Sequence, residues 1–378
     1  MKSLPLQSSQ TLLGPRYSAA AKAPALSAAQ RATRERIVNR EAAGDWEEVP
    51  CLCGALASDV VVSEIERHGL PYRKCLCTAC GLLRVNPRWT QQRLARFYAE
   101  EYRSLYASSP TRDLESHIQW IARNGSAKAV AAFVEKAVTA KRAAMNSATL
   151  AETPGRLPRI ALKVVEIGAG GGWNLAGLPK SWQRIGYDTD EAYLIAGRKL
   201  FGVDLRNGFL TDAIKEAGDA DAVLLSHVVE HLSDPVTALR DVAAALPARG
   251  LVLIEVPGVF RIHSTARDPM VYMQNAHLYT FCAQTVARTC EMAGLEVLSV
   301  DEWCRVVARR AANGQTSVRA PDPDLARRIL AYLQACERAH RFTAKVRSVP
   351  FIGGAAGRVV GKLYGLAMQH SLPKPSGV

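Results

Sequence analysis

A glycine-rich run follows an apolar segment near the middle of the chain. Five residues carry its pattern: Glu166, Gly168, Ala169, Gly170 and Gly172. Glycine has no Cβ, so the backbone can turn sharply and lie close to a ligand. The free amides at the start of a following helix would face that ligand. The run therefore predicts a ligand-binding turn between a strand and a helix.

Two carboxylates narrow the class of ligand. Asp188 lies 20 residues after Gly168, a spacing at which an acid at the end of the second strand accepts hydrogen bonds from ribose hydroxyls. Glu166 opens a Glu-x-Gly-x-Gly-x-Gly pattern. A carboxylate there favours a ligand with positive charge and disfavours a pyrophosphate. We therefore expect a nucleoside that carries a cationic group.

This combination resembles the class I S-adenosylmethionine (SAM)-dependent methyltransferases. In that family the glycine loop lies under the methionine part of the cofactor, and the strand-two acid holds the ribose. The resemblance covers roughly residues 155–310. It continues in the segment 221–235, which is similar to a strand-four segment with a Leu-Glu-His run before Asp-Pro, although Val229 stands in the Leu position. The resemblance implies SAM as cofactor, and we also assign Phe209 and Ser226 to its site.

Two histidines follow the expected fourth strand. His227 and His231 lie in the loop 226–233, and ligands of open α/β sheets bind at the carboxyl ends of the strands. A neutral imidazole can take the proton of a hydroxyl during methyl transfer. We expect His231 to be the leading candidate for this base. The alternative for either ring is a supporting role, bonded to the backbone.

A third histidine lies in the segment Asn275–Phe281. This segment resembles the His-x-x-Tyr-Phe stretch of sugar-modifying methyltransferases, which implies that His277 reaches the acceptor. The sugar C-methyltransferases place Tyr and Glu just before this histidine, whereas this chain has Gln274 and Ala276. We therefore expect O-methylation of a sugar or sugar-like small molecule, with sugar C-methylation as the alternative.

Four cysteines form two closely spaced pairs near the amino terminus. Cys51 and Cys53 precede Cys77 and Cys80 by 23 intervening residues, and each pair ends in glycine. Four thiolates from two tight turns match a tetrahedral structural zinc. The region resembles the small zinc module of many sugar and surface-polysaccharide methyltransferases. Cys75 could substitute as a ligand, and the alternative is a module of free thiols.

Apolar runs alternate with helical patterns after residue 160, which predicts an α/β fold: a doubly wound, Rossmann-like and mostly parallel sheet with an antiparallel closing strand. We expect strands at 161–167, 184–187, 203–206, 222–225 and 251–256, a closing pair at 295–300 and 305–308, and helices at 235–246 and 283–292. An amphipathic pattern over 116–148 predicts one long helix, or two with a break near Gly125.

These elements group into five expected regions: a disordered basic tail (1–45), a zinc-binding module (46–90), a helical connector (91–150), the methyltransferase domain (155–312) and a helical basic extension (313–378). The 378 residues carry a formal net charge of +13, and almost all of it lies before residue 35 and after residue 337. Because the body is nearly neutral, we expect no specific nucleic-acid partner, only weak contact of the basic tails with an anionic membrane surface.

Cysteine usage and the lack of a long apolar segment favour a soluble cytoplasmic protein. An organelle address is the alternative for the acid-free amino terminus. Two further alternatives to a sugar methyltransferase are a nucleic-acid-binding zinc protein with a methyltransferase fold and an inactive protein of this fold. The acceptor and the oligomeric state do not follow from the sequence.

Overall fold

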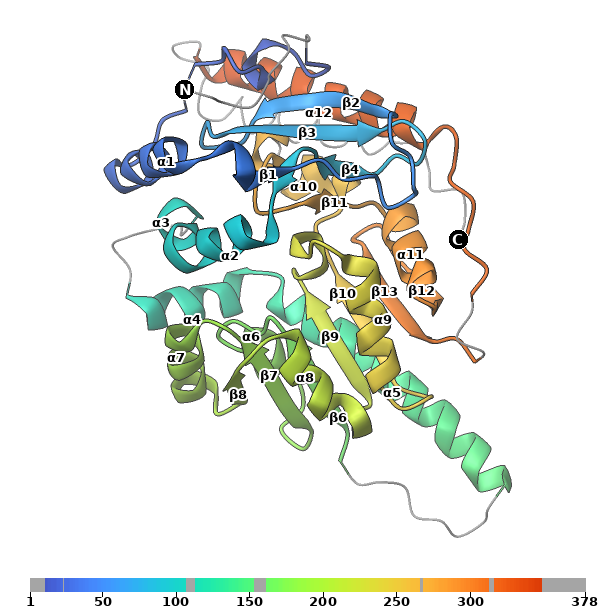
Figure 1. Cartoon of the computed structure of the whole chain (residues 1–378). Helices are drawn as coiled ribbons and strands as arrows, with labels where there is room; N and C mark the ends of the chain where they lie inside the picture. Colours follow the sequence, from blue (N-terminus) through green and yellow to red (C-terminus); the bar gives the residue numbers. More distant parts are fainter. Residues whose placement is uncertain are drawn as a thin grey trace. The chain divides into compact units, whose positions relative to one another are not determined.

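A computed structural model describes residues 11–22, 24–106, 113–152, 161–265, 268–312 and 316–348 (Figure 1). The chain splits into two compact units, each built from separate stretches of sequence. Unit 1 comprises residues 1–108, 257–285 and 320–378, and unit 2 comprises residues 109–256 and 286–319.

Unit 2 is built on a seven-stranded mixed sheet. Its strands are β6 (Lys163–Ile167), β7 (Gln183–Asp188), β8 (Asp204–Asn207), β9 (Ala222–Ser226), β10 (Leu251–Glu255), β12 (Leu295–Val300) and β13 (Arg305–Arg310). They lie in the order β12-β13-β10-β9-β6-β7-β8. β13 runs antiparallel to both neighbours, whereas β6 to β10 pair in parallel. The expected Rossmann-like sheet with an antiparallel closing strand is confirmed.

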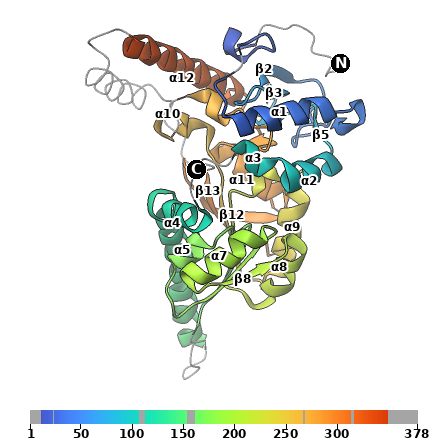
Figure 2. The same cartoon turned by 90° about the vertical axis from the view of Figure 1, so that its left-hand side faces the viewer.

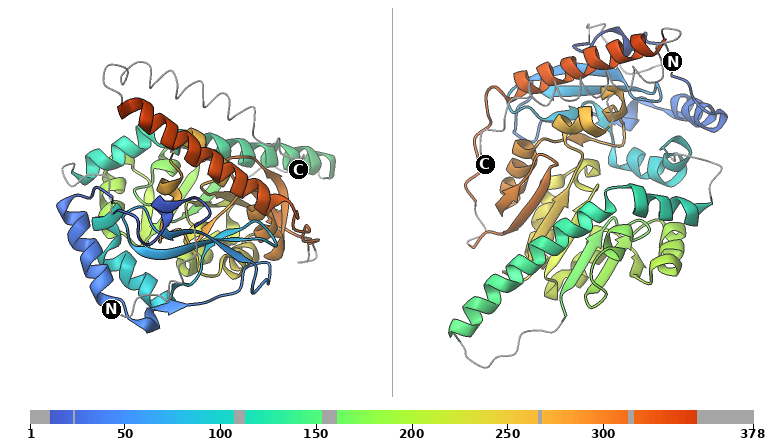
Figure 3. Two further views of the ribbon diagram at one scale, coloured as in Figure 1. Left: turned by 90° about the horizontal axis from the view of Figure 1, so that it is seen from above. Right: turned by 180° about the vertical axis from the view of Figure 1, so that it is seen from behind.

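Helices cover both faces of this sheet, and its central strands are buried along their whole length. Every residue of β6, β9 and β10 is buried, as expected for parallel strands packed on two sides. Figures 1 and 3 show α8 (Leu210–Glu216) and α9 (Pro235–Ala245) on one face and α5 (Ala127–Glu152) on the other. The shorter α6 (Trp173–Ala176) packs against α5 and α7 (Glu191–Phe201).

The amphipathic pattern before the sheet forms two helices. α4 (Leu114–Asn124) ends at Gly125, and α5 begins at Ala127, so the predicted break is confirmed. Both helices belong to unit 2, where α4 packs against α7 and α5 against α6. Residues 113–150, expected as part of a connector, are therefore part of the domain that carries the sheet.

Unit 1 contains a four-stranded antiparallel sheet in the order β11-β4-β3-β2. Its strands are β2 (Asp59–Ile65), β3 (Pro71–Cys77), β4 (Leu83–Val85) and β11 (Tyr279–Thr280), and β1 (Trp46–Glu47) pairs separately with β5 (Arg88–Trp89). α12 (Leu325–Ser348) packs its apolar side into the same core as the sheet. Figure 2 shows α1 (Ala28–Arg40), α2 (Gln91–Glu100) and α3 (Tyr102–Tyr106) side by side.

Short helices complete the described chain: α10 (Ile262–Thr265), α11 (Ala283–Met292), and the 3-10 turns η1 (Pro15–Tyr17), η2 (Ala43–Asp45), η3 (Ala217–Asp219), η4 (Val229–His231), η5 (Val259–Arg261) and η6 (Pro269–Tyr272). Within the described ranges, no helix has both the length and the hydropathy that crossing a membrane requires.

The amino-terminal segment corrects the expectation of a disordered tail over residues 1–45. Residues 11–22 and 24–45 have defined positions, α1 begins at a Ser27 capping box, and Tyr17 and Ile37 are buried. The sequence did not predict helix α1, because it buries only Thr33 and Ile37, which are too few residues to give a helical period of apolar positions. Residues 1–10 and 349–378, which hold much of the predicted basic tails, lie outside the described residues.

Candidate cofactor and catalytic site

The glycine turn follows β6 at the point where the order of the sheet reverses. β6 lies between β7 and β9, so the carboxyl ends of β6 and β9 flank a topological switch point, where ligands of such sheets bind. Gly168, Gly170 and Gly172 have φ angles of 71°, 53° and 73°. These left-handed conformations favour glycine. The structure therefore places the predicted loop where a cofactor site is expected.

Asp188 joins the glycine loop to the end of β7. Its Oδ2 accepts a hydrogen bond from the Gly170 amide at 2.7 Å, and its Oδ1 accepts one from the Asp190 amide at 2.9 Å. Each carboxylate oxygen has two lone pairs, so Asp188 can hold the loop and still accept a ribose hydroxyl. The backbone of Gly208 donates to the Asp188 carbonyl, and this places Phe209, 40% exposed, in the neighbouring loop.

Glu166 is fully buried in β6 with half of its carboxylate unsatisfied. Asn174 donates to Oε1 at 2.7 Å, whereas Oε2 has no hydrogen-bond partner among the described residues. Burial raises the pKa of Glu166 to about 8 against the opposing bond from Asn174, and the nearby charges of Asp188 and Glu255 raise it further. A buried carboxylate without a partner is costly. A cationic ligand group would satisfy it, so these residues fit SAM.

The loop after β9 contains a carboxylate between two histidines. Glu230 is 1% exposed. Its Oε1 lies 3.3 Å from Nδ1 of His227 and 3.8 Å from Nε2 of His231. The side chain of His227 is 50% exposed, whereas that of His231 is 20% exposed. The structure thus brings both predicted histidines to one buried acid. This acid is the middle residue of the Val-Glu-His run, and the sequence alone predicted no role for it.

His227 adopts a backbone conformation that is unfavourable for a residue other than glycine. Its φ is 55°, and its amide donates to the Glu255 carbonyl at 2.8 Å. Such strain is concentrated at functional sites. Partial burial by itself would lower the pKa of His227, but the close contact with Glu230 and the charges of Glu230 and Glu255 raise it above the ordinary value. Burial would raise the pKa of Glu230, and the two histidines lower it.

Ser226 and Glu255 pair at the ends of β9 and β10. The Ser226 hydroxyl donates to Glu255 Oε2 at 3.0 Å, and both side chains are buried. Arg305 donates to the other oxygen at 3.4 Å. The contact of Ser226 with the cofactor stays a prediction. The sequence analysis did not predict Glu255 as a site residue. The signal that could have identified it is an acidic residue at the end of an otherwise apolar strand.

His277 belongs to unit 1, whereas His227 and His231 belong to unit 2. It is 9% exposed and lies just before β11. Its backbone carbonyl accepts a hydrogen bond from Lys74 Nζ at 2.9 Å. The proposed contact of its ring with an acceptor stays a prediction.

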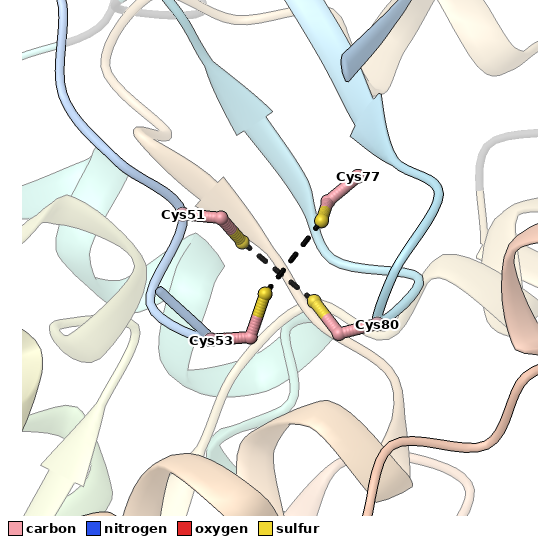
Figure 4. Close-up of side chains that lie close together, drawn as sticks. All are labelled: Cys51, Cys53, Cys77 and Cys80. Carbon is pink, nitrogen blue, oxygen red and sulfur yellow. Dashed lines mark hydrogen bonds between the residues drawn. The ribbon is translucent and has the colours of Figure 1, made fainter. Parts of the chain in front are cut away.

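The four paired cysteines of unit 1 converge on one point, as Figure 4 shows. Sγ of Cys51 lies 3.6 Å from that of Cys80, and Sγ of Cys53 lies 3.7 Å from that of Cys77. A tetrahedral zinc with Zn–S bonds of about 2.3 Å separates its sulfurs by roughly 3.8 Å. The arrangement therefore fits the predicted ligand set.

Cys75 lies outside this cluster. Its thiol donates to the Asn86 carbonyl at 3.4 Å, and burial raises its pKa to about 12. A ligand thiol must ionise to bind zinc, so the structure gives no support to Cys75 as a substitute ligand. The remaining cysteines are all buried: Cys282, Cys290, Cys304 and Cys336.

One family model and several solved structures are similar to parts of the chain. Residues 121–300 match a family model described as a methyltransferase domain. No curated protein matches the sequence. Among solved structures, the chain is similar to the YcgJ protein from Bacillus subtilis, at 19% identity and a TM-score of 0.30 over 37% of this chain and 65% of that one.

Two further solved structures are similar to the chain. One is the trans-methyltransferase CalH in complex with SAH, at 18% identity and a TM-score of 0.33 over 40% of this chain and 52% of that one. The other is a SAM-dependent methyltransferase from Thermotoga maritima, at 17% identity and a TM-score of 0.35 over 52% of this chain and 96% of that one. The match thus spans less than two thirds of YcgJ and of CalH.

The glycine turn at the switch point of a mixed α/β sheet, together with the family match, defines a class. The chain contains a methyltransferase domain, since residues 121–300 match that family model and include the glycine turn. The family match begins within α4 and ends with β12, so it covers most of unit 2.

Proposed function

We propose that the chain transfers the methyl group of SAM to a hydroxyl of a sugar or sugar-like small molecule, including nucleotide- and lipid-linked forms. The observation that carries this proposal is the histidine pair that flanks buried Glu230 after β9. Val228, next to His227, packs against the glycine turn: a Cβ built on Gly168 would lie 2.5 Å from a Val228 methyl. The imidazole is therefore carried by a loop that touches the cofactor loop.

His227 is the better placed of the two candidate bases. Because Glu230 lies at Nδ1, it favours the tautomer with the proton on that nitrogen and leaves Nε2 to accept one. When bound, SAM supplies an electrophilic methyl group. The acceptor oxygen would receive that methyl group from the sulfonium sulfur, and Nε2 of His227 would take the hydroxyl proton. The products are a methyl ether, S-adenosylhomocysteine and a protonated imidazole.

A polar acceptor is supported by Asn275. This side chain is fully buried, and neither its nitrogen nor its oxygen has a hydrogen-bond partner among the described residues. Such a carboxamide is costly unless something pairs with it, and adjacent sugar hydroxyls offer both a donor and an acceptor. It lies in the segment that resembles the sugar-modifying enzymes.

The test is methyl transfer from SAM labelled with ¹³C in the methyl group to a panel of free, nucleotide-linked and lipid-linked sugars. Carbon NMR separates O-methyl from C-methyl products. We expect an O-methyl signal that His227→Ala greatly reduces while S-adenosylhomocysteine still binds. A C-methyl signal would favour the alternative chemistry. Binding of S-adenosylhomocysteine without transfer to any sugar would contradict the proposed acceptor class.

We also propose one structural zinc per chain, held by Cys51, Cys53, Cys77 and Cys80. Elemental analysis of the purified protein should give about one zinc, and the double variant Cys77→Ser/Cys80→Ser should lose it. Cys75→Ser is the matched control, because that thiol is buried nearby but lies outside the cluster. Equal zinc in the wild type and the double variant would contradict this ligand set.

The remaining proposals concern location and partners. We propose a cytoplasmic enzyme that acts on small-molecule or glycan acceptors, binds no specific nucleic acid, and contacts anionic membrane surfaces weakly through its basic termini. Sedimentation with anionic vesicles at low and high salt tests the last point.

A further inference from the structure

We propose that the cysteine module positions the acceptor-side segment that carries Asn275 and His277, and that the side chain of Lys74 helps to hold this segment in place. The inference rests on the proposed methyl transfer to a sugar. It goes further by giving the module a part in the use of the acceptor, beyond its own stability.

The acceptor-side segment is the fourth strand of the sheet that the cysteine module builds. β11, at Tyr279–Thr280, pairs antiparallel with β4, so that Tyr279 lies opposite Arg84 and Thr280 opposite Leu83. One residue earlier, the Leu278 carbonyl accepts a hydrogen bond from the Val85 amide at 2.8 Å. A segment nearly 200 residues away in the chain therefore depends on β4 for its backbone pairing.

Lys74 extends this pairing to the histidine itself. Its side chain on β3 is 1% exposed, and Nζ donates to the His277 carbonyl at 2.9 Å. No carboxylate lies within ion-pair distance of Nζ in the described part of the chain. Burial of an amine without a counter-ion is costly and lowers its pKa, to about 7 for Lys74. A methionine would fill this space at a lower free-energy cost. The hydrogen bond to His277 therefore accounts for the presence of a lysine at this position.

The cysteine turn joins the two strands that hold the segment. β3 ends at Cys77, and Lys74 lies three residues before it, opposite Val85 of β4. Cys80 lies in the turn to β4, which is closed by a bond from the Gly81 amide to the Cys77 carbonyl. A metal at the four sulfurs would fix this turn. Its loss would loosen the β3–β4 register that sets the positions of Lys74 and Val85.

Residues of the cysteine module and of α2 donate hydrogen bonds to the backbone of the segment at four positions. Besides Leu278 and His277, the Met273 carbonyl accepts from the Arg67 amide at 2.7 Å, and the Ala276 carbonyl accepts from the Tyr98 hydroxyl at 3.4 Å. All four acceptors are main-chain carbonyls. These hydrogen bonds therefore fix the backbone of the segment, and none of them involves the carboxamide of Asn275.

The primary test is Lys74→Met, which keeps the volume and removes the donor. We expect hydrogen exchange of residues 276–281 to become about tenfold faster and kcat with the acceptor to fall. Zinc content and affinity for S-adenosylhomocysteine should stay as in the wild type. Lys74→Arg retains a donor and should restore part of both the exchange protection and kcat.

Tyr72→Phe is the matched control, because Tyr72 is fully buried on the same strand and its hydroxyl has no partner among the described residues. This variant should match the wild type in all four measurements. If Lys74→Met leaves both exchange and kcat unchanged, the proposed role of Lys74 is wrong. If Tyr72→Phe reproduces the effects of Lys74→Met, general loosening of β3 is the cause and the specific role of Lys74 is refuted.

Removal of zinc tests the module separately. After treatment with a chelator, exchange of residues 276–281 should rise while S-adenosylhomocysteine still binds. Unchanged exchange in zinc-free protein would overturn the inference. This measurement needs no acceptor, so it decides the inference even if the proposed sugar acceptor fails, and a failed acceptor panel alone leaves the exchange result standing.

Discussion

Gly170 and Gly202 share a left-handed backbone but differ in what surrounds them. A Cβ on Gly170 (φ 53°) would lie 2.5 Å from the Trp173 ring, whereas a Cβ on Gly202 (φ 60°) would meet nothing within 4 Å. Both alanine variants should lose about 1–2 kcal/mol of stability through strain. Only Gly170→Ala should weaken binding of S-adenosylhomocysteine by calorimetry, because it disturbs the cofactor loop. Equal affinity in both variants would contradict the assigned loop.

Glu230 sets the protonation of His227, which predicts a pH effect. Glu230 and Glu255 raise the pKa of His227 above 6.5, so the imidazole stays protonated to a higher pH, and the rate should rise as pH increases through that raised value. Glu230→Gln removes the nearer charge and should move the rising limb to lower pH. It should also reduce kcat by about 10²-fold or more, because the tautomer is no longer fixed.

The profile of kcat against pH for the two proteins checks this prediction, with S-adenosylhomocysteine affinity as the control for folding. A profile that keeps its position and height in Glu230→Gln would show that Glu230 does not act on the base. If His231→Ala abolishes the rising limb while His227→Ala retains it, the base is His231, as first expected from the sequence.

Some residues of the candidate sites could be predicted from local sequence motifs. Others became apparent only from long-range contacts in the structure. Asp188 and the four clustered cysteines stand at fixed spacings from glycines, so the sequence alone identified them as candidates. Lys74 and Glu255 acquire their partners from segments that are remote in the chain: Lys74 meets His277, and Glu255 meets Ser226 and Arg305. No short pattern encodes such a contact.

Elements with strong periodicity were predicted closely, and elements without it were not. The expected helix at 235–246 is observed as Pro235–Ala245, with Asp234 accepting from the Thr237 amide as its cap. The expected strand at 251–256 is observed as Leu251–Glu255. By contrast, β11 has two residues, which is too short for an alternating pattern to appear. Its place in unit 1 could not be predicted.

α4 has a role that its amphipathic pattern did not reveal. Ile118 is fully buried, and a Cβ built on Gly171 would lie 3.0 Å from it, so α4 packs directly on the cofactor loop. Ile118→Ala should cost about 2–5 kcal/mol in unfolding free energy and also weaken S-adenosylhomocysteine binding. Val242→Ala on α9, also fully buried, should lower stability without this loss of affinity. Similar affinities in both variants would contradict support of the loop by α4.

At the scale of the whole molecule, the order of the chain does not follow the order of the units. The sequence suggested consecutive regions, but residues 257–285 leave the sheet of unit 2 and complete the core of unit 1, together with α12. Composition and periodicity describe neighbours along the chain, so they could not show that Met273, Cys282 and Ile329 share a core with Tyr72. Apolar residues of this kind look alike whichever unit buries them.

This division into two units predicts two unfolding transitions, one that responds to a cofactor ligand and one that responds to removal of metal. The glycine loop and Asp188 lie wholly within unit 2, and the four cysteines lie wholly within unit 1. S-Adenosylhomocysteine at 100 times its Kd should add about 2.7 kcal/mol to unit 2 alone, which raises its Tm by roughly 5–10 °C for a unit of this size. A chelator should lower the Tm of unit 1. Scanning calorimetry with each reagent, and with Cys77→Ser/Cys80→Ser as a chelator-insensitive control, measures both shifts. One transition that moves as a whole with either reagent would show that the two units unfold together, and would refute their independence.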